Sequence, residues 1–165
     1  MRPAAYSAVT GARKTCVAAG RVGEGGDLSA FSSAEWGGQK ADWKKFWKAA
    51  LHNAAEDFKQ VEIRFHRDAN RVIRYAEVQS RQGRMAAVVL APEFARHFVD
   101  TMGESFLLAV PNRYQCFVFP KLAWDVSRYA PLVQEAYRAT AYPVSTELFE
   151  CETGGVWAVG MFERP

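Results

Sequence analysis

The residues of this chain that could do chemistry are scattered, in no pattern typical of an enzyme. The sequence His-Arg-Asp at residues 66–68 also occurs in the catalytic loop of protein kinases, but that loop has an Asn five residues after its Asp, and here position 73 is Ile. No Gly-x-Ser-x-Gly elbow, Walker motif or dinucleotide-binding glycine motif occurs. We therefore interpret residues 66–68 as the polar end of a strand and a turn.

Metal binding and thiol chemistry are not predicted either. His52, His66 and His97 each lack the second His or Cys, three or four residues on, that a helical metal pair needs. Cys116 and Cys151 lie among apolar residues of expected strands, where a thiol packs as a small hydrophobic group. We expect no metal, no cofactor, and free cysteines in a reducing compartment.

The best candidate site is a loop between two expected strands. Pro111 fixes a bend, and the guanidinium of Arg113 after Asn112 is suited to a carboxylate or phosphate. We predict that these three residues, together with Glu93, contact a ligand or partner. An ordinary hairpin turn is the alternative interpretation. A competing hypothesis is an enzyme or small-ligand site in which Glu93, Arg113 and His97 converge.

An arginine-rich segment is the feature of the sequence that argues most for nucleic-acid binding. Alternation along the chain spreads these arginines over two strand faces and two turns, which favours charged rims of an exposed sheet. The formal net charge of +3 and a pI near 8.8 are only mildly basic. We therefore expect a protein partner rather than nucleic acid, whose binding would weaken steeply with salt. The arginines are Arg64, Arg67, Arg71, Arg74, Arg81 and Arg84.

Hydrophobic periodicity predicts the elements that must position these residues. From Trp43 to Phe58 apolar residues recur at spacings of three and four, which predicts a helix with Asp42 as its N-cap. Further helices are predicted over 92–102 and 129–137, where Pro92 begins one and Gly103 ends it. Alternating or β-rich runs predict strands at 61–65, 72–78, 85–90, 106–110, 114–119, 148–151 and 156–161.

These elements predict an α+β fold. We expect an antiparallel or mixed sheet with helices mainly on one face, in the order α-βββ-α-ββ-α-ββ. Residues 72–78 and 85–90 are expected to pair as a hairpin around Gly83.

The composition predicts one domain behind a tail. The chain has 165 residues, 49% of them hydrophobic and 24% charged, which suits a single globular domain at 41–165. Residues 1–40 are rich in Gly, Ala and Ser, and we expect a flexible tail with at most one helical turn where Ser32 and Glu35 have capping-box spacing. No apolar run approaches the roughly 20 residues of a membrane span, so a soluble cytoplasmic protein is expected.

Two segments resemble the YtpQ-like family of uncharacterised bacterial proteins. They are residues 85–94 and 106–113, and residues 142–149 are similar to the family's Pro-Leu-Ser closing segment. The resemblance spans about residues 42–160 and implies a bacterial cytoplasmic protein of unknown activity. The family usually has Asp after its Pro-(Ser or Asn)-Arg, whereas this chain has Tyr114, which argues against a role for that carboxylate here.

Together these features favour binding over catalysis. The sequence offers hairpin edges and basic rims but no recognisable acid/base pair, nucleophile or phosphate-binding loop. Our leading hypothesis is a non-catalytic protein-interaction or accessory module. The alternative is an enzyme or small-ligand-binding protein with a site around Glu93 and Arg113.

Overall fold

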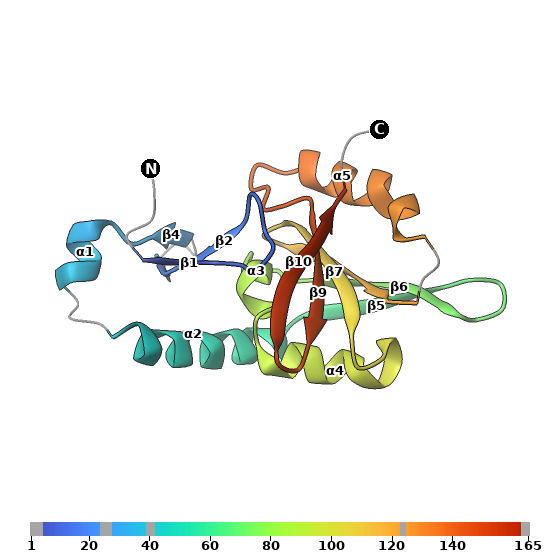
Figure 1. The fold of residues 1–165 in the computed structure, drawn as a ribbon, viewed down its shortest axis with the longest axis horizontal. Helices are drawn as coiled ribbons and strands as arrows, with labels where there is room; N and C mark the ends of the chain where they lie inside the picture. Colours follow the sequence, from blue (N-terminus) through green and yellow to red (C-terminus); the bar gives the residue numbers. More distant parts are fainter. Residues whose placement is uncertain (1–4, 24–27, 39–41, 123–124, 163–165) are drawn as a thin grey trace.

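A six-stranded antiparallel sheet forms the centre of the molecule (Figure 1). The computed structural model describes residues 5–23, 28–38, 42–122 and 125–162. The strand order is β10-β9-β7-β8-β6-β5, so the predicted α+β class with an antiparallel sheet is confirmed. The strands are β5 (Glu62–Arg67), β6 (Ile73–Gln79), β7 (Phe106–Asn112), β8 (Gln115–Pro120), β9 (Glu147–Glu152) and β10 (Gly155–Met161), and the helices beside them are α2 (Trp43–Phe58), α3 (Met85–Val88), α4 (Pro92–Met102) and α5 (Ala130–Arg138).

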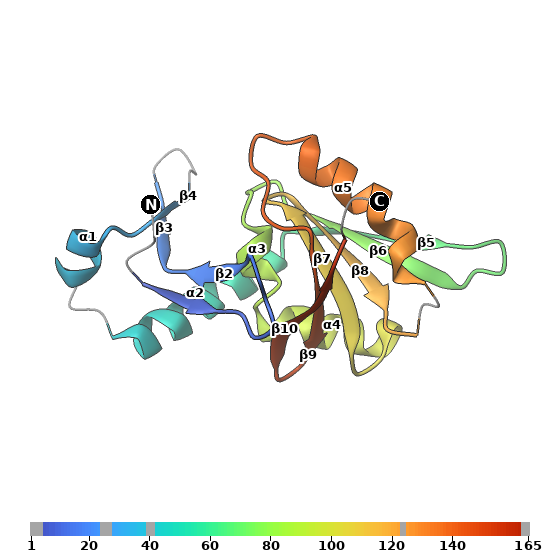
Figure 2. The ribbon, with the colours of Figure 1, turned by 45° about the horizontal axis from the view of Figure 1, so that its top comes forward.

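Helices cover both faces of the sheet, as Figures 1 and 2 show. Helices α3 and α4 pack on one face, where Phe94 and Phe98 are fully buried against Phe106 of β7. Helix α2 joins this layer through the ring of Phe58, whose centroid lies 5.7 Å from that of Phe94. Helix α5 lies on the opposite face, where Val133 is buried in a second apolar cluster. Three of these four helices thus share one face.

The predicted strand at residues 85–90 is wrong, because this segment forms the short helix α3. Met85, Val88 and Val89 are buried while Ala86 and Ala87 are exposed, and that spacing of three and four suits a helix. A short apolar run rich in valine does not distinguish a strand from a buried helical turn, and the two alanines favour the helix. The element order from α2 is therefore α-ββ-αα-ββ-α-ββ.

The predicted hairpin of residues 72–78 with 85–90 is therefore also wrong. Strand β6 pairs with β5 on one side and with β8 on the other, both antiparallel. Strands β5 and β6 are joined by a turn in which Asp68 Oδ1 accepts hydrogen bonds from the backbone N–H groups of Asn70 and Val72, each 2.9 Å. From the sequence, the expected strands 106–110 and 114–119, and likewise 148–151 and 156–161, are also predicted to pair as hairpins, and these hairpins, β7–β8 and β9–β10, are confirmed.

The three predicted helices are confirmed, and the residues predicted to begin and end them lie at the ends of α2 and α4. Asp42 accepts a hydrogen bond of 3.0 Å from the backbone N–H of Lys44 at the start of α2. Pro92 opens α4, and Gly103 follows it with a φ of 99°, a conformation that suits glycine. Helix α5 is preceded by a 3₁₀ turn, η1 (Val126–Tyr129).

The N-terminal segment has secondary structure that the sequence did not predict. It contains the hairpins β1 (Tyr6–Ala8) with β2 (Cys16–Ala18), and β3 (Gly20–Val22) with β4 (Leu28–Ala30). Helix α1 (Ser33–Gly38) follows. Its capping box is formed: the Ser32 backbone N–H donates to Glu35 Oε2 at 2.8 Å, and the Glu35 N–H donates to Ser32 Oγ at 3.3 Å.

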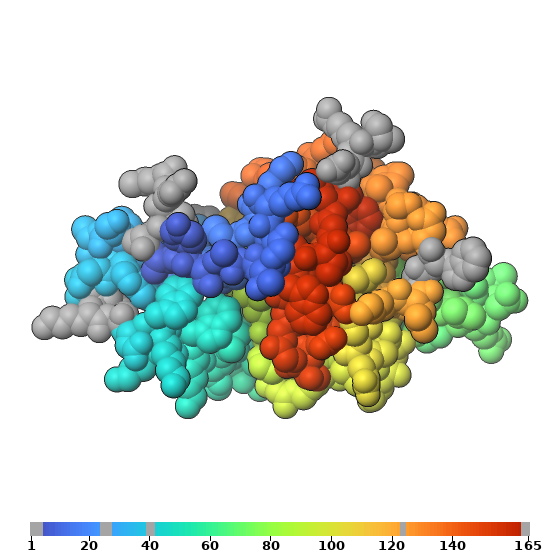
Figure 3. Space-filling model, in the orientation of Figure 1, coloured from blue at the N-terminus to red at the C-terminus, as the bar shows by residue number. Residues whose placement is uncertain are grey.

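The loop between β1 and β2 is fastened to the edge of the main sheet. Figure 3 shows N-terminal residues lying against β10. The buried Glu147 carboxylate accepts hydrogen bonds from the backbone N–H groups of Arg13 and Lys14, at 2.6 and 3.2 Å, and from the Thr15 hydroxyl. The backbone N–H of Ala158 donates to the Thr10 carbonyl at 2.8 Å. Residues 10–15 therefore act as a clasp, by which name we refer to them below, and are not a tail free of the domain.

Candidate functional site

One half of a sheet face is polar and is not covered by α5. Side chains of β5 alternate, so Ile63 and Phe65 pack against the core beside α4 while Glu62, Arg64 and His66 face the opposite side. The apolar cluster beneath α5 draws on β7, β8 and β9, and only Tyr75 of β6 packs against it. The α5 side of β5 and β6 therefore carries hydrogen-bonding groups at the surface.

A row of polar residues runs in register across four strands. Glu62 of β5 is paired with Gln79 of β6, Gln79 with Gln115 of β8, and Gln115 with Asn112 of β7. Paired residues in an antiparallel sheet point to the same face, so the four side chains share one side. This row forms the floor of the candidate site.

The carboxylate of Glu77 organises the next row. Its Oε1 accepts hydrogen bonds from the amide nitrogens of Gln79, at 2.6 Å, and Gln115, at 2.5 Å. His66 Nε2 lies 3.4 Å from Oε2. Only 15% of the Glu77 side chain is exposed, so its charge is held by these partners rather than by water. The network fixes both glutamine amides in one orientation.

Tyr75, on the polar half of this sheet face, is covered by neighbouring rings rather than exposed. The ring of His66 stacks on Tyr75, with centroids 4.2 Å apart and planes inclined by 9°, and Tyr129 meets Tyr75 edge-on at 5.3 Å. Burial raises the pKa of the Tyr75 hydroxyl, and the nearby Glu77 carboxylate and Tyr129 raise it further. Tyr75 is therefore not placed as an open platform on which a nucleic-acid base could stack.

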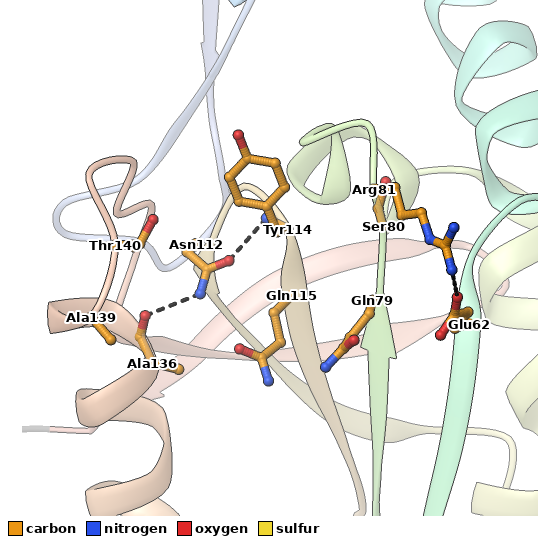
Figure 4. Close-up of a pocket in the computed structure, with 10 residues that line it drawn as sticks. All are labelled: Glu62, Gln79, Ser80, Arg81, Asn112, Tyr114, Gln115, Ala136, Ala139 and Thr140. Carbon is orange, nitrogen blue, oxygen red and sulfur yellow. Dashed lines mark hydrogen bonds and ion pairs between the residues drawn. The ribbon is translucent and has the colours of Figure 1, made fainter.

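A pocket of about 480 Å³ opens above the polar row (Figure 4). It lies between the sheet and the C-terminal end of α5, which contributes Ala136, Ala139 and the following Thr140. The other lining residues are Glu62, Gln79, Ser80, Arg81, Asn112, Tyr114 and Gln115. The volume suits a small ligand or one large side chain of a partner.

Asn112 lines this pocket, but its side chain is hydrogen-bonded to the backbone on both sides. Its Nδ2 donates to the carbonyl of Ala136 at 3.0 Å, and its Oδ1 accepts from the backbone N–H of Tyr114 at 2.9 Å. Figure 4 shows both bonds. Pro111 is buried, and its carbonyl accepts from the N–H of Val144. The structure thus gives Pro111 and Asn112 the role of shaping the pocket and tying its turn to α5.

Arg113 lies beside the pocket with its guanidinium oriented by two contacts. The Arg113 Nε donates to the carbonyl of Gly83 at 3.4 Å, and the guanidinium carbon lies 4.6 Å from the ring centroid of Tyr142. Tyr114 and Tyr142 are 40% and 43% exposed, with ring centroids 6.3 Å apart. Two exposed tyrosines and an oriented guanidinium therefore share one patch at the mouth of the pocket. We refer to Arg113, Tyr114 and Tyr142 as the Arg-Tyr patch.

Glu93 and His97 lie elsewhere, on α4. Glu93 forms an ion pair with Arg96, one turn along the helix, at 2.9 Å. His97 contacts the rings of Phe58 and Phe98 edge-on. Within the described part of the chain, no hydrogen bond or ion pair joins either residue to Arg113. The structure thus does not bring together the three residues of the competing site hypothesis.

Several arginines of the segment 64–84 are engaged with carboxylates. Arg74 pairs with Asp68 at 3.2 Å, Arg81 with Glu62 at 2.7 Å, and Arg84 with Asp57 at 2.5 Å. The largely buried pair of Arg84 with Asp57 must be broken before this guanidinium can bind a phosphate, whereas the exposed pair of Arg81 with Glu62 is weak.

The cysteines are free thiols, and the two in the sheet are buried. Burial raises the pKa of Cys116 and of Cys151, so both thiols stay protonated at neutral pH. Among the described residues, no three His, Cys, Asp or Glu side chains are grouped so as to hold a metal ion. No helix in the described ranges is long and apolar enough to cross a membrane.

Comparisons with known proteins found no relative of this chain. No family model, no curated protein and no solved structure matches the chain.

Reasoning from the sequence missed the residues that build the site floor and its patch. Glu77, Gln79 and Gln115 belong to no recognisable sequence motif, and Tyr142 belongs only to the segment 142–149, which is similar to the YtpQ-like family's closing segment. The alternation along β5 and β6 already places Glu62, Glu77 and Gln79 on a solvent face. The pairing of β6 with β8, which brings in Gln115, depends on long-range register that alternation does not reveal.

Proposed function

We propose that this protein is a non-catalytic protein-interaction module whose interface is centred on the Arg-Tyr patch. The observation that carries the proposal is the exposure of Tyr114 and Tyr142 beside an oriented Arg113, at the mouth of a pocket. Tyrosine and arginine dominate binding energy at protein interfaces, because each combines a large contact surface with directed hydrogen bonds. A fixed guanidinium also loses less entropy on binding than a free one.

The chemistry of the surroundings supports binding rather than catalysis. The thiols of Cys116 and Cys151 are buried and protonated, which makes them poor nucleophiles. The Glu77 carboxylate accepts hydrogen bonds from two amides and lies next to His66. These groups hold a surface in shape more readily than they activate a substrate.

A capture experiment with matched variants tests the proposal. The full chain, Tyr114→Ser and Leu122→Ser serve as baits for lysate, with mass spectrometry as the readout. Leu122 is 92% exposed and lies beyond the other end of β8, so its replacement controls for the general loss of a surface apolar group. We expect a protein that is retained by the wild type and Leu122→Ser and lost by Tyr114→Ser. Equal capture by all three baits would contradict the proposal.

The pocket favours a second candidate, a small-ligand-binding protein. Its volume of about 480 Å³ lies within the range of small-molecule sites. In that case the ligand would lie above Gln79 and Gln115, with Arg113 at the rim and without Glu93. A rise in Tm on adding the small-molecule fraction of a lysate, absent in a variant that fills the pocket such as Ala139→Trp, tests this alternative. Membership of the YtpQ-like family and a bacterial, cytoplasmic setting remain predictions.

A further inference from the structure

We propose that the pocket beside the Arg-Tyr patch receives a protonated lysine or arginine side chain of the partner protein. The inference rests on the proposed function, since it names the group that a partner bound at the patch would place in the pocket. Three features of the pocket carry it: its fixed hydrogen-bond acceptors, its exchangeable ion pair and its position at the end of a helix.

The amide groups on the pocket floor present acceptors to a ligand. Both amide nitrogens, of Gln79 and of Gln115, donate to Glu77 Oε1. An ionised carboxylate only accepts, so the NH₂ side of each amide must face Glu77 and the carbonyl oxygen must face away from it. Figure 4 shows the two glutamine side chains on the floor between Asn112 and Glu62. Each oriented carbonyl oxygen can therefore accept a hydrogen bond from a ligand that carries N–H donors.

The rim of the pocket adds a negative charge that a ligand cation can share. Glu62 pairs with Arg81 at 2.7 Å, but 60% of the Glu62 side chain and 89% of the Arg81 side chain are exposed. An ion pair this exposed is weak and exchanges readily with another cation. A lysine or arginine of the partner could therefore take the place of Arg81 beside Glu62.

The remaining wall suits both the charge and the stem of a basic side chain. Helix α5 points its C-terminal end at the pocket, and the negative end of its dipole favours a cation there. Ala136, Ala139 and the ring of Tyr114 supply apolar surface at the same place. Long basic side chains bury their methylene stems on such surface while the charged end reaches polar groups.

Titration with short peptides tests this inference. The ¹⁵N-labelled full chain is titrated with acetyl-Ala-Arg-Ala-amide, with the same peptide carrying neutral citrulline, and with acetyl-Ala-Glu-Ala-amide. We expect the arginine peptide to shift the side-chain amide signals of Gln79 and Gln115, and to bind about fivefold more tightly than the citrulline peptide. Glu62→Gln, at an exposed position, should weaken the arginine peptide about two- to fivefold.

Other results would overturn the inference. Equal affinity for the arginine and citrulline peptides, stronger binding of the glutamate peptide, or no shift with any probe would each exclude a cation-selective pocket. These outcomes are independent of the capture experiment. Capture that depends on Tyr114 without selectivity for arginine would support the interface and reject the cation pocket. Selective binding of the arginine peptide without Tyr114-dependent capture would support a cation-binding pocket and reject the proposed interface.

Discussion

The guanidinium of Arg113 lies 4.6 Å from the ring centroid of Tyr142, and the backbone N–H of Arg113 also donates to the Tyr142 carbonyl at 3.3 Å. The turn after β7 and the loop after α5 are thus joined through main chain and side chain at one point. The backbone contact does not depend on the arginine side chain. Replacing that side chain therefore tests binding with little disturbance of the fold.

We predict that Arg113→Ala abolishes partner capture at little cost in stability. The side chain contributes one long hydrogen bond and one exposed cation–π contact, together about 1 kcal/mol or less in the free energy of unfolding. Denaturant unfolding and the capture assay measure the two effects. A large loss of stability with capture unchanged would assign Arg113 to structure and remove it from the interface.

Lysine substitutions test whether residues 85–88 form a helix. In α3 both Ala86 and Ala87 are exposed, so lysine at either position should change the free energy of unfolding by less than about 0.5 kcal/mol. Val88→Lys should cost about 3 kcal/mol or more, because a charge would enter the core. In a strand, residues 86 and 88 would share a face. Equal damage from Ala86→Lys and Val88→Lys, with Ala87→Lys neutral, would contradict the helix.

The clasp should open at acid pH. Burial alone raises the pKa of Glu147, but hydrogen bonds from Thr15 and from the backbone N–H groups of Arg13 and Lys14 outweigh it and lower the pKa. A lowered folded-state pKa gives stability that is present above the ordinary value of 4.5 and is lost as pH falls through the folded value. The backbone N–H signals of Arg13 and Lys14 in NMR spectra should therefore shift toward random-coil positions below pH 4.5.

Variants of two strand glutamates provide the control for this pH dependence. Glu147→Gln replaces one accepting oxygen by a donor, so the clasp should be weakened at neutral pH by about 1–3 kcal/mol. Glu152→Gln changes an exposed glutamate of the same strand and should leave the clasp intact. An unaltered clasp in Glu147→Gln would refute its dependence on the carboxylate.

Close approach of the clasp to β10 makes Gly11 sensitive to substitution. Its φ is 76°, and a Cβ at this position would collide with the carbonyl oxygen of Ala158. Gly11→Ala should therefore release the segment, at a cost of about 1–3 kcal/mol, and speed its cleavage in limited proteolysis. Gly37→Ala, in α1 with open space around it, should be neutral or slightly stabilising. Equal proteolysis of both variants would contradict the close contact.

Most elements of the sheet domain were predictable because local signals decide them. The stripe of apolar residues in α2, the Pro92 and Gly103 signals of α4, and the alternation in β5 all agree with the structure. The strand predicted at residues 85–90 was wrong because a run of four to six apolar residues fits either a strand or a helical turn. The N-terminal strands are three residues long, too short for periodicity to show.

The candidate site was predictable only in part. Pro111 and Asn112 belong to the end of β7 rather than to the expected loop, and Asn112 lines the pocket while its side chain holds the turn. Contact of Pro111, Asn112 and Arg113 with a ligand or partner stays a prediction. Glu93 is placed on α4 with Arg96 as its partner. The floor of the pocket spans two hairpins, β5–β6 and β7–β8, which are joined by the long-range pairing of β6 with β8. Spacing along the sequence carries no trace of that pairing.

Site-specific photo-crosslinking tests the central claim most directly. A photoreactive phenylalanine analogue replaces either Tyr114 or Leu122, two exposed positions at opposite ends of β8. We predict a covalent adduct with the partner protein from position 114 and none from position 122. The same adduct from both positions, or an adduct from position 122 alone, would show that partners do not bind at the Arg-Tyr patch.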